Sequence, residues 1–180
     1  MLLVMGCMLL GNAAALMAAP QLLADTVKAG YIYQFSQFVT WPELPDKPRN
    51  SFDICIMGKG AISDELDPLD GKNESGRLIS IIYPQTRQDV FGCNILYIAE
   101  AEGHQVQAVL GYLRSRPVLT VSSLPGFAES GGIIGFVSSN GKIRFEINRE
   151  AALRSNIQLS AKLLEVASKV FHGYPEEERP

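Results

Sequence analysis

The stretch SFDICIM, residues 51–57, decides the class of fold that we expect for this chain. Its apolar side chains Phe52, Ile54 and Ile56 share one face of a strand, and the residues between them share the other face. Three more apolar runs follow, with helical patterns over residues 61–69 and 105–114 between them: RLISIIY (77–83), NILYIA (94–99) and PVLTVSS (117–123). This alternation is typical of βαβ units, whose central strands are buried on both faces.

The last third of the chain adds an antiparallel element. The segments GGIIGFVS (131–138) and KIRFEIN (142–148) flank Asn140-Gly141, and an Asn-Gly pair between two strand patterns is a strong signal for a β-hairpin. A short helix over residues 150–154 and a closing helix over residues 160–171 follow, the latter with a core-facing set of Leu163, Leu164, Ala167, Val170 and Phe171. We therefore predict a single-domain α/β fold in which a mixed β-sheet is flanked by helices on both faces.

Length and charge narrow the classes of function. A chain of 180 residues is long enough for one domain with a substantial core. It carries 16 basic and 19 acidic residues, a net charge of −3, and no cluster of basic residues. Binding to the phosphate groups of nucleic acids requires such a cluster, so we do not expect a nucleic-acid partner.

The first 24 residues form a segment without any charged side chain. An apolar run over residues 2–10 is followed by small residues and Pro20, and the first charge is Asp25. We interpret residues 1–24 as a cleaved export signal, because glycine, asparagine and proline residues interrupt the apolarity that a membrane-spanning helix needs. A retained anchor is the alternative; Cys7 lies too close to the start for a lipoprotein site.

The proposed cleavage defines the remaining parts of the chain. Residues 25–172 form the folded domain, and we expect the charged tail at residues 173–180 to be disordered. We expect no direct insertion of the cleaved protein into a membrane.

Two cysteines, Cys55 and Cys93, remain after cleavage. In an oxidising compartment they can form one intramolecular disulfide, provided that their Cα atoms lie within about 7 Å. Such a bond would stabilise the fold by about 4 kcal/mol on the chain-entropy model. The alternative is a pair of buried free thiols that pack as small apolar side chains.

Aromatic residues are concentrated in the first helix, which we expect over residues 25–40. Val27, Tyr31, Phe35 and Phe38 follow helical spacing, so they form the stripe that we expect to face the core. Trp41-Pro42 ends the helix, because proline disfavours the helical conformation of the residue before it.

Other side chains are candidates for recognition rather than for the core. Tyr33 and Trp41 fall outside the helical stripe, so they need a pocket, a ligand or a partner. The alternation of the strand at residues 142–148 places polar side chains on the face opposite Phe145. This row is either an ordinary polar outer face or a recognition strip, and it consists of Arg144, Glu146 and Asn148. Phe127, in the loop at residues 124–132, is a further candidate.

The sequence offers no convincing catalytic set. The run Gly58-Lys59-Gly60-Ala61-Ile62-Ser63 only partly matches a dinucleotide-binding fingerprint, and RLISIIYP ends without the acidic residue that binds a ribose. His104 and His172 stand in separate contexts without cysteine or carboxylate partners at ligand spacing. We therefore predict a protein that is not an enzyme, with no catalytic residues, no metal site and no cofactor.

Several segments, in the right order, resemble the YfiR family of small exported bacterial proteins. They are KAGYIYQFSQFVTWP (28–42), FDICIMG (52–58), CNILYI (93–98), RSRPVLTVSSLPGFAESGGIIGFV (114–137), KIRFEIN (142–148) and SAKLLEVASKV (160–170). The resemblance implies a periplasmic repressor that binds the periplasmic part of an inner-membrane diguanylate cyclase and restrains cyclic-di-GMP synthesis and biofilm growth. It also implies a disulfide, because Cys55 and Cys93 match the positions of a family cysteine pair. A second pair that some members carry is missing here.

These observations lead to two hypotheses of function. The first is a non-enzymatic periplasmic regulator that uses Tyr31, Tyr33, Trp41, Phe127, Arg144, Glu146 and Asn148 to bind a membrane signalling protein. The alternative is a periplasmic small-molecule sensor that reports to another membrane receptor, with Tyr31, Tyr33 and Trp41 stacking on an aromatic or cationic ligand. A homodimer is a candidate assembly, since symmetric dimers are the commonest oligomers.

Overall fold

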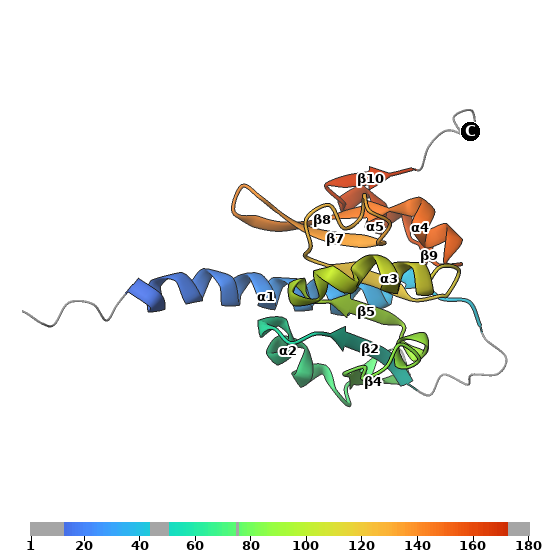
Figure 1. Cartoon of the computed structure of the whole chain (residues 1–180), viewed down its shortest axis with the longest axis horizontal. Helices are drawn as coiled ribbons and strands as arrows, with labels where there is room; N and C mark the ends of the chain where they lie inside the picture. The colour runs from blue at the N-terminus through green and yellow to red at the C-terminus, as the bar shows by residue number, and fades with distance from the viewer. Residues whose placement is uncertain (1–12, 44–50, 75, 173–180) are drawn as a thin grey trace, which may run out of the picture.

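A mixed β-sheet of eight strands organises the chain in the computed structural model, which describes residues 13–43, 51–74 and 76–172 (Figure 1). From one edge to the other the strands are β10 (Lys169–Phe171), β8 (Lys142–Asn148), β7 (Ile134–Ser139), β6 (Leu119–Ser122), β5 (Ile95–Ile98), β2 (Ser51–Met57), β4 (Arg77–Ile82) and β3 (Asn73–Glu74). The pairs β7–β8 and β3–β4 are antiparallel and the other neighbours are parallel. A separate two-stranded pair joins β1 (Val39–Thr40) to β9 (Gln158–Leu159).

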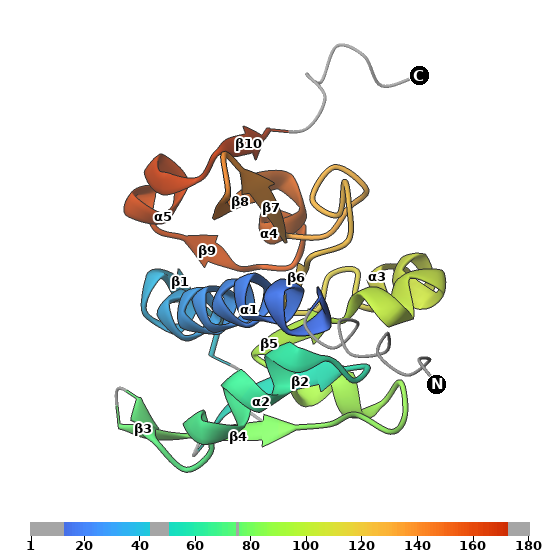
Figure 2. The same cartoon turned by 90° about the vertical axis from the view of Figure 1, so that its left-hand side faces the viewer.

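Helices cover both faces of the sheet, as predicted. The helical segments are α1 (Ala13–Phe38), α2 (Ala61–Leu66), α3 (Val106–Tyr112), α4 (Arg149–Arg154) and α5 (Ala161–Val166), with short 3-10 helices η1 (Asp67–Leu69), η2 (Asp89–Gly92) and η3 (Glu100–Gln105). Figure 2 shows α1 and α3 on opposite sides of β5 and β6. The two faces have separate cores, because Ile32 and Phe35 of α1 pack in one cluster and Val109 of α3 packs in the other.

The alternation of SFDICIM is confirmed by the burial of β2. Phe52, Ile54 and Ile56 belong to the core beneath α1, whereas Cys55 belongs to the core beneath α3. β2 pairs in parallel with both β4 and β5, so both of its edges are used as well as both of its faces. A strand buried in this way fits the nearly continuous apolar run of its sequence.

The predicted hairpin is also confirmed. Asn140 and Gly141 have φ angles of 51° and 70°, the positive values that a two-residue type I′ turn requires at both central positions. The turn sets the register between β7 and β8, in which Phe136 lies directly opposite Phe145. These two rings therefore point to the same face of the sheet, toward α1.

The stripe predicted for the first helix is only partly correct. Ala29, Ile32 and Phe35 are the side chains of α1 that lie fully in the core, and Val27 is 39% exposed. Tyr31 and Phe38 are half-buried at the margins of the contact. The buried face is centred on Ala29, Ile32 and Phe35, so the helical spacing used for the prediction identified Phe35 but misplaced the centre of the face.

The described part of α1 begins at Ala13, earlier than the predicted start at residue 25. The predicted signal segment at residues 1–24 overlaps this helix, and its first 12 residues lie outside the described residues. The structure therefore does not test cleavage, which stays a prediction. The tail predicted to be disordered, residues 173–180, also lies outside the described residues.

The predicted closing helix over residues 160–171 is wrong in its second half. α5 ends at Val166, and Ala167 takes an extended conformation with φ of −65° and ψ of 142°. The backbone N–H and the hydroxyl of Ser168 both donate to the carbonyl of Phe145, at 2.9 Å and 2.8 Å. This anchor directs the chain into β10, which pairs with β8, so the hydrogen bonds available at the sheet edge override the helical pattern.

Cys55 and Cys93 form the predicted disulfide, with 5.8 Å between their Cα atoms. Cys55 lies in β2 and Cys93 lies two residues before β5, so the bond joins two neighbouring strands in the core beneath α3. Both residues are buried, as both alternatives required, and the bond between their sulfur atoms makes the free-thiol alternative wrong for this structure.

Replacing both cysteines by alanine should lower the free energy of unfolding by about 4 kcal/mol, since the bond closes a loop with a sequence separation of 38 residues. Urea denaturation of the oxidised wild type and of the Cys55→Ala/Cys93→Ala variant measures the difference. Dithiothreitol should destabilise only the wild type. Equal midpoints for the two proteins would show that the bond does not form or does not stabilise the fold.

Candidate functional site

The candidate residues from the sequence do not gather in one place. Trp41 and Tyr33 serve contacts within the fold, Tyr31 lines a pocket between α1 and α5, and Arg144 and Glu146 lie on the opposite face of the sheet. Phe127 and Asn148 are buried. We describe these positions in turn.

Trp41 is a structural contact at the end of α1. Its indole Nε1 donates to the carbonyl of Asn94 at 3.0 Å, and its ring meets Phe52 edge to face with 5.1 Å between centroids. The same carbonyl of Asn94 also accepts from the backbone N–H of Leu119. The indole therefore closes the end of the core. Its position outside the helical stripe required a pocket, a ligand or a partner, and the fold provides the pocket.

Tyr33 belongs to a contact between α1 and the edge strand β3. A hydrogen bond with the carboxylate of Glu74, together with the negative charge of that group, raises the pKa of the Tyr33 hydroxyl. Glu74 is itself buried. A ligand would have to displace this contact in order to use Tyr33.

Tyr31 lies in an aromatic cluster over β7 and β8. Its ring centroid is 5.3 Å from Phe145 in an edge-to-face arrangement and 6.1 Å from Phe136. Phe35 stands 5.4 Å from Phe145 on the other side of the cluster. Such arrangements add to the stability gained from burial alone.

This cluster forms one wall of a pocket of about 220 Å³, which we call the aromatic pocket. The pocket is lined by Tyr31, Gln34, Phe35 and Phe38 of α1, Phe145 of β8, and Lys162, Leu163 and Val166 of α5. The ammonium group of Lys162 stands 5.4 Å from the centre of the Phe38 ring, a cation–π contact at the rim. Val166 is 56% exposed, so the pocket offers an apolar surface to the outside.

The sequence did not identify Lys162 and Val166 as members of a site. The pattern of residues 160–171 indicated only an amphipathic helix. What makes the pocket is the short length of α5 and its position beside α1, neither of which is encoded in the spacing of its residues.

Arg144 and Glu146 lie on the other face of the β7–β8 hairpin. Glu146 is directly opposite Gly135, and a Cβ built on Gly135 would lie 3.2 Å from the backbone nitrogen of Ala128. The loop at residues 124–132 therefore covers this face beside Glu146. Arg144 is exposed and Glu146 is half-buried, next to Lys169 of β10.

Phe127 is an internal anchor of that loop rather than an exposed side chain. It is 3% exposed and belongs to the core that contains the disulfide. A Cβ on Gly132 would lie 2.1 Å from its ring, so the glycine allows the ring to lie against the backbone. The expectation that Phe127 presents a recognition surface does not agree with this burial.

Asn148 is also buried, which corrects the predicted polar row on β8. Its side-chain oxygen accepts from the backbone N–H of Ala151 at 2.8 Å, and its Nδ2 donates to the carbonyl of Ala128 at 2.7 Å. The side chain therefore caps α4 and fixes the loop at residues 124–132. Asparagine is a preferred residue at the start of a helix for this reason.

The connection after β2 leads to β4 on one side, and the connection after β5 leads to β6 on the other side. Open α/β sheets usually bind ligands at the carboxyl ends of two such neighbouring strands. Gly58 follows β2 with a φ of 86°, and a Cβ built on it would lie 2.6 Å from Cγ of Glu102. The glycine thus serves the close approach of Glu102.

An ionic cluster continues along the same edge of the sheet. Lys28 and Asp25 of α1 form a buried ion pair with 3.0 Å between Nζ and Oδ1. Burial raises the pKa of Tyr97, and the negative charges of Glu100 and Asp25 act in the same direction. The Tyr97 hydroxyl and the hydroxyl of Ser123 lie 3.2 Å apart. Each of these groups has a partner within the fold.

Within residues 13–43, 51–74 and 76–172, no three His, Cys, Asp or Glu side chains gather where a metal ion could be held. In the same part of the chain, no helix combines the length and the apolarity needed to cross a membrane.

Comparison with protein families identifies the family of this chain. A family model described as YfiR/HmsC-like matches residues 25–168, which is more than half of the chain. No curated protein matches the chain.

Ten chains among the solved structures match this one. A conserved domain protein from Vibrio cholerae O1 biovar El Tor strain N16961 has 11% identity and a TM-score of 0.52, with 81% of this chain and 60% of that chain covered. The ABC domain in complex with L-Trp from Streptococcus pneumonia has 10% identity and a TM-score of 0.48, with 68% of this chain and 56% of that chain covered. The chain thus spans less than two thirds of either structure, and identities this low concern the fold alone.

Asn148→Ala should lower the free energy of unfolding by about 1–2 kcal/mol, because it removes the helix cap. Thermal and urea denaturation measure this change. Arg149→Ala, at the neighbouring exposed position, is the control and should change stability by less than about 0.5 kcal/mol. Normal stability of Asn148→Ala would contradict the structural role and return Asn148 to the candidates for recognition.

Proposed function

We propose, because this chain belongs to the YfiR/HmsC-like family, that it is a periplasmic regulatory protein that binds and represses an inner-membrane signalling protein. The match over residues 25–168 is the observation that carries the proposal. The partner that we propose is the periplasmic part of a diguanylate cyclase. Its repression would keep cyclic-di-GMP low and restrain biofilm formation.

Two features support a location in the periplasm. The family match begins at residue 25, directly after the uncharged segment that we interpret as an export signal. The buried disulfide between Cys55 and Cys93 requires an oxidising compartment, which the bacterial periplasm provides.

The aromatic pocket is the surface that we propose for the partner. Its volume of about 220 Å³ lies below the usual range for small-molecule sites, about 300–1,000 Å³, and suits one large apolar side chain. Tight interfaces commonly depend on a few such anchors in desolvated pockets. Val166 at the rim would become buried in the complex, and Lys162 would remain at the polar border.

Repression by binding follows mass action. Only the fraction of the regulator that is bound to the cyclase represses it, so anything that binds the free regulator lowers repression. The rigid sheet and its disulfide would keep the aromatic pocket in place without a conformational change.

A second candidate function, a small-molecule sensor, is supported by the same pocket. Four aromatic side chains line it, which suits a small planar or cationic ligand such as the sequence suggested. Trp41 and Tyr33 do not line it, so a ligand there would act through Tyr31. Shifts of the Tyr31 ring resonances on ligand addition, without any effect on partner binding, would favour this function.

Val166→Asp should weaken binding of the periplasmic part of the cyclase by about tenfold or more, because a carboxylate would be buried at the apolar rim. Leu153→Asp on α4 is a matched control, since Leu153 is also 56% exposed but lies outside the pocket. Titration of each purified variant against the partner domain measures the affinities. Equal binding by Val166→Asp and wild type would exclude the aromatic pocket as the contact.

Deletion of the gene should raise cyclic-di-GMP and surface adhesion, and the wild-type gene should restore both. The Val166→Asp gene should fail to restore them, while Leu153→Asp should succeed. Unchanged cyclic-di-GMP in the deletion strain would contradict control of a cyclase.

A further inference from the structure

A small polar cavity lies on the α3 side of the sheet, away from the aromatic pocket. It has a volume of about 130 Å³ and is bounded by α3, the loop at residues 124–132, and α4. Its polar side chains come from separate parts of the chain and are Gln107, Arg114, Ser115, Thr120, Ser130, Arg154 and Ser155. We call it the arginine cavity.

The charged side chains that line this cavity are positive, which favours an anion. Arg114 and Arg154 are the charged side chains among its lining residues, and no carboxylate is among them. Arg154 forms an ion pair with Glu150, one turn earlier in α4. A guanidinium group has five N–H donors, so this pair leaves most of the donors of Arg154 available.

Neither arginine is needed to complete a helix end. The last carbonyls of α4, those of Ala151, Ala152 and Leu153, accept from backbone N–H groups of residues 155–157. In the same way, the carbonyls of Val109 and Gly111 at the end of α3 accept from the backbone N–H groups of Leu113 and Arg114. The guanidinium groups are therefore not held as caps.

The cavity also collects donors that have no partner in the described part of the chain. The guanidinium of Arg114 and the hydroxyls of Ser115, Ser130 and Ser155 make no hydrogen bond or ion pair to any described residue. Ser155 is 8% exposed, whereas Arg114, Ser115 and Ser130 are open to solvent. An anion in the cavity would accept from all four groups.

We infer that the arginine cavity binds a compact anion that carries a phosphate or a carboxylate group. Both groups match the planar fork of a guanidinium, and hydroxyl donors complete their coordination. The space would hold about ten water molecules, which is enough for inorganic phosphate or a short dicarboxylate but too small for a nucleotide. The inference does not depend on the proposed partner.

A bound anion would connect α3, the loop at residues 124–132, and α4. Gln107 of α3 already donates to the carbonyl of Ser130 at 3.2 Å, and Arg154 approaches from α4. An anion between them would hold the loop at residues 124–132 against α3 and α4. Because this loop covers the hairpin beside Glu146, anion binding can change the surface around Arg144 and Glu146.

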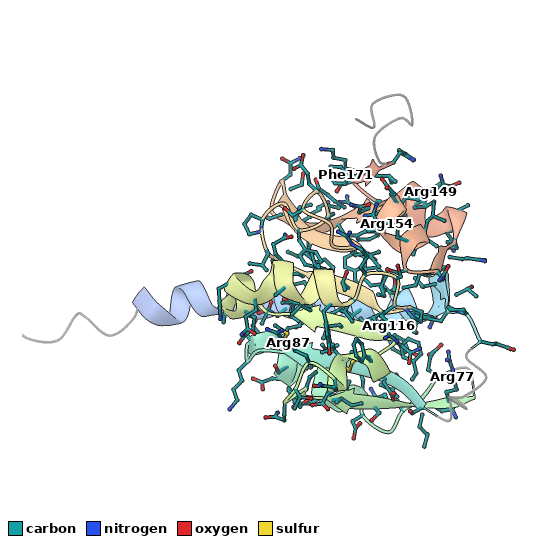
Figure 3. All side chains as sticks on the ribbon, turned by 45° about the vertical axis from the view of Figure 1, so that its right-hand side comes forward. Arg77, Arg87, Arg116, Arg149, Arg154 and Phe171 are labelled. Atoms are coloured by element: carbon teal, nitrogen blue, oxygen red, sulfur yellow. A yellow bond between two sulfur atoms is a disulfide. The ribbon has the colours of Figure 1, made fainter. Side chains whose placement is uncertain are left out.

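The test compares single arginine variants. Wild type, Arg114→Ala, Arg154→Ala and the control Arg149→Ala are titrated calorimetrically with inorganic phosphate and with succinate. Arg149 and Arg154 both belong to α4 (Figure 3), but Arg149 does not line the cavity. We expect one of the two anions to bind wild type saturably, about tenfold weaker binding to each cavity variant, and less than about twofold change in Arg149→Ala.

Further variants separate the outcomes. Arg114→Lys keeps the charge but loses the fork, so it should bind less tightly than wild type and more tightly than Arg114→Ala. Circular dichroism checks that each variant is folded, and amide resonances of Ser115, Ser130 and Ser155 should shift together on titration. Absence of saturable binding of both anions, or equal weakening by Arg149→Ala, would overturn the inference.

A phosphate group could also belong to a lipid. Sedimentation with phosphatidylglycerol vesicles distinguishes the sources: free phosphate as the ligand predicts the same low pelleting for wild type and Arg114→Ala. A lipid headgroup predicts pelleting of wild type that Arg114→Ala reduces. Vesicle binding that is the same in both proteins, without saturable binding of a free anion, would count against the site.

Discussion

Strand β2 is covered on both faces and paired along both edges, and the position of every other element follows from this burial. Phe52, Ile54 and Ile56 hold α1 against one face, and Cys55 faces the core of α3 on the other. The disulfide to Cys93 joins β2 to the beginning of β5 within that second core. A strand with no free face cannot shift its register, because a shift of one residue would exchange its two faces.

The β7–β8 hairpin also has two different faces, one toward α1 and the other toward the loop at residues 124–132. Phe136 and Phe145 both point toward α1, and Phe145 lines the aromatic pocket. On the opposite face, Gly135 leaves room for the loop at residues 124–132, which Phe127 and Asn148 anchor from within. The molecule therefore has two separate surfaces, one apolar beside α5 and one cationic beside α4. The proposed partner and the inferred anion would therefore bind to different faces of the sheet.

The comparison of predicted and observed elements shows where sequence patterns are reliable. Patterns of period two identified β2, and Asn140-Gly141 identified the hairpin, because both depend on local geometry. The buried stripe of α1 was misplaced because helical spacing fits more than one set of apolar residues, and the set that the sheet buries includes Ala29 and Ile32 rather than Val27. The helix expected after Val166 became β10, since pairing with β8 and the bonds from Ser168 to Phe145 come from residues distant in sequence.

The sequence by itself determined the mixed α/β class, the cysteine pair, and the family to which the chain belongs, because these depend on residue types and their order along the chain. It could not assign roles to single polar and aromatic side chains. Trp41 and Asn148 looked available for recognition, and the fold uses them to bond with Asn94, Ala128 and Ala151. Only the tertiary structure decided the two cavities, since each is lined by residues from elements that meet through long-range packing.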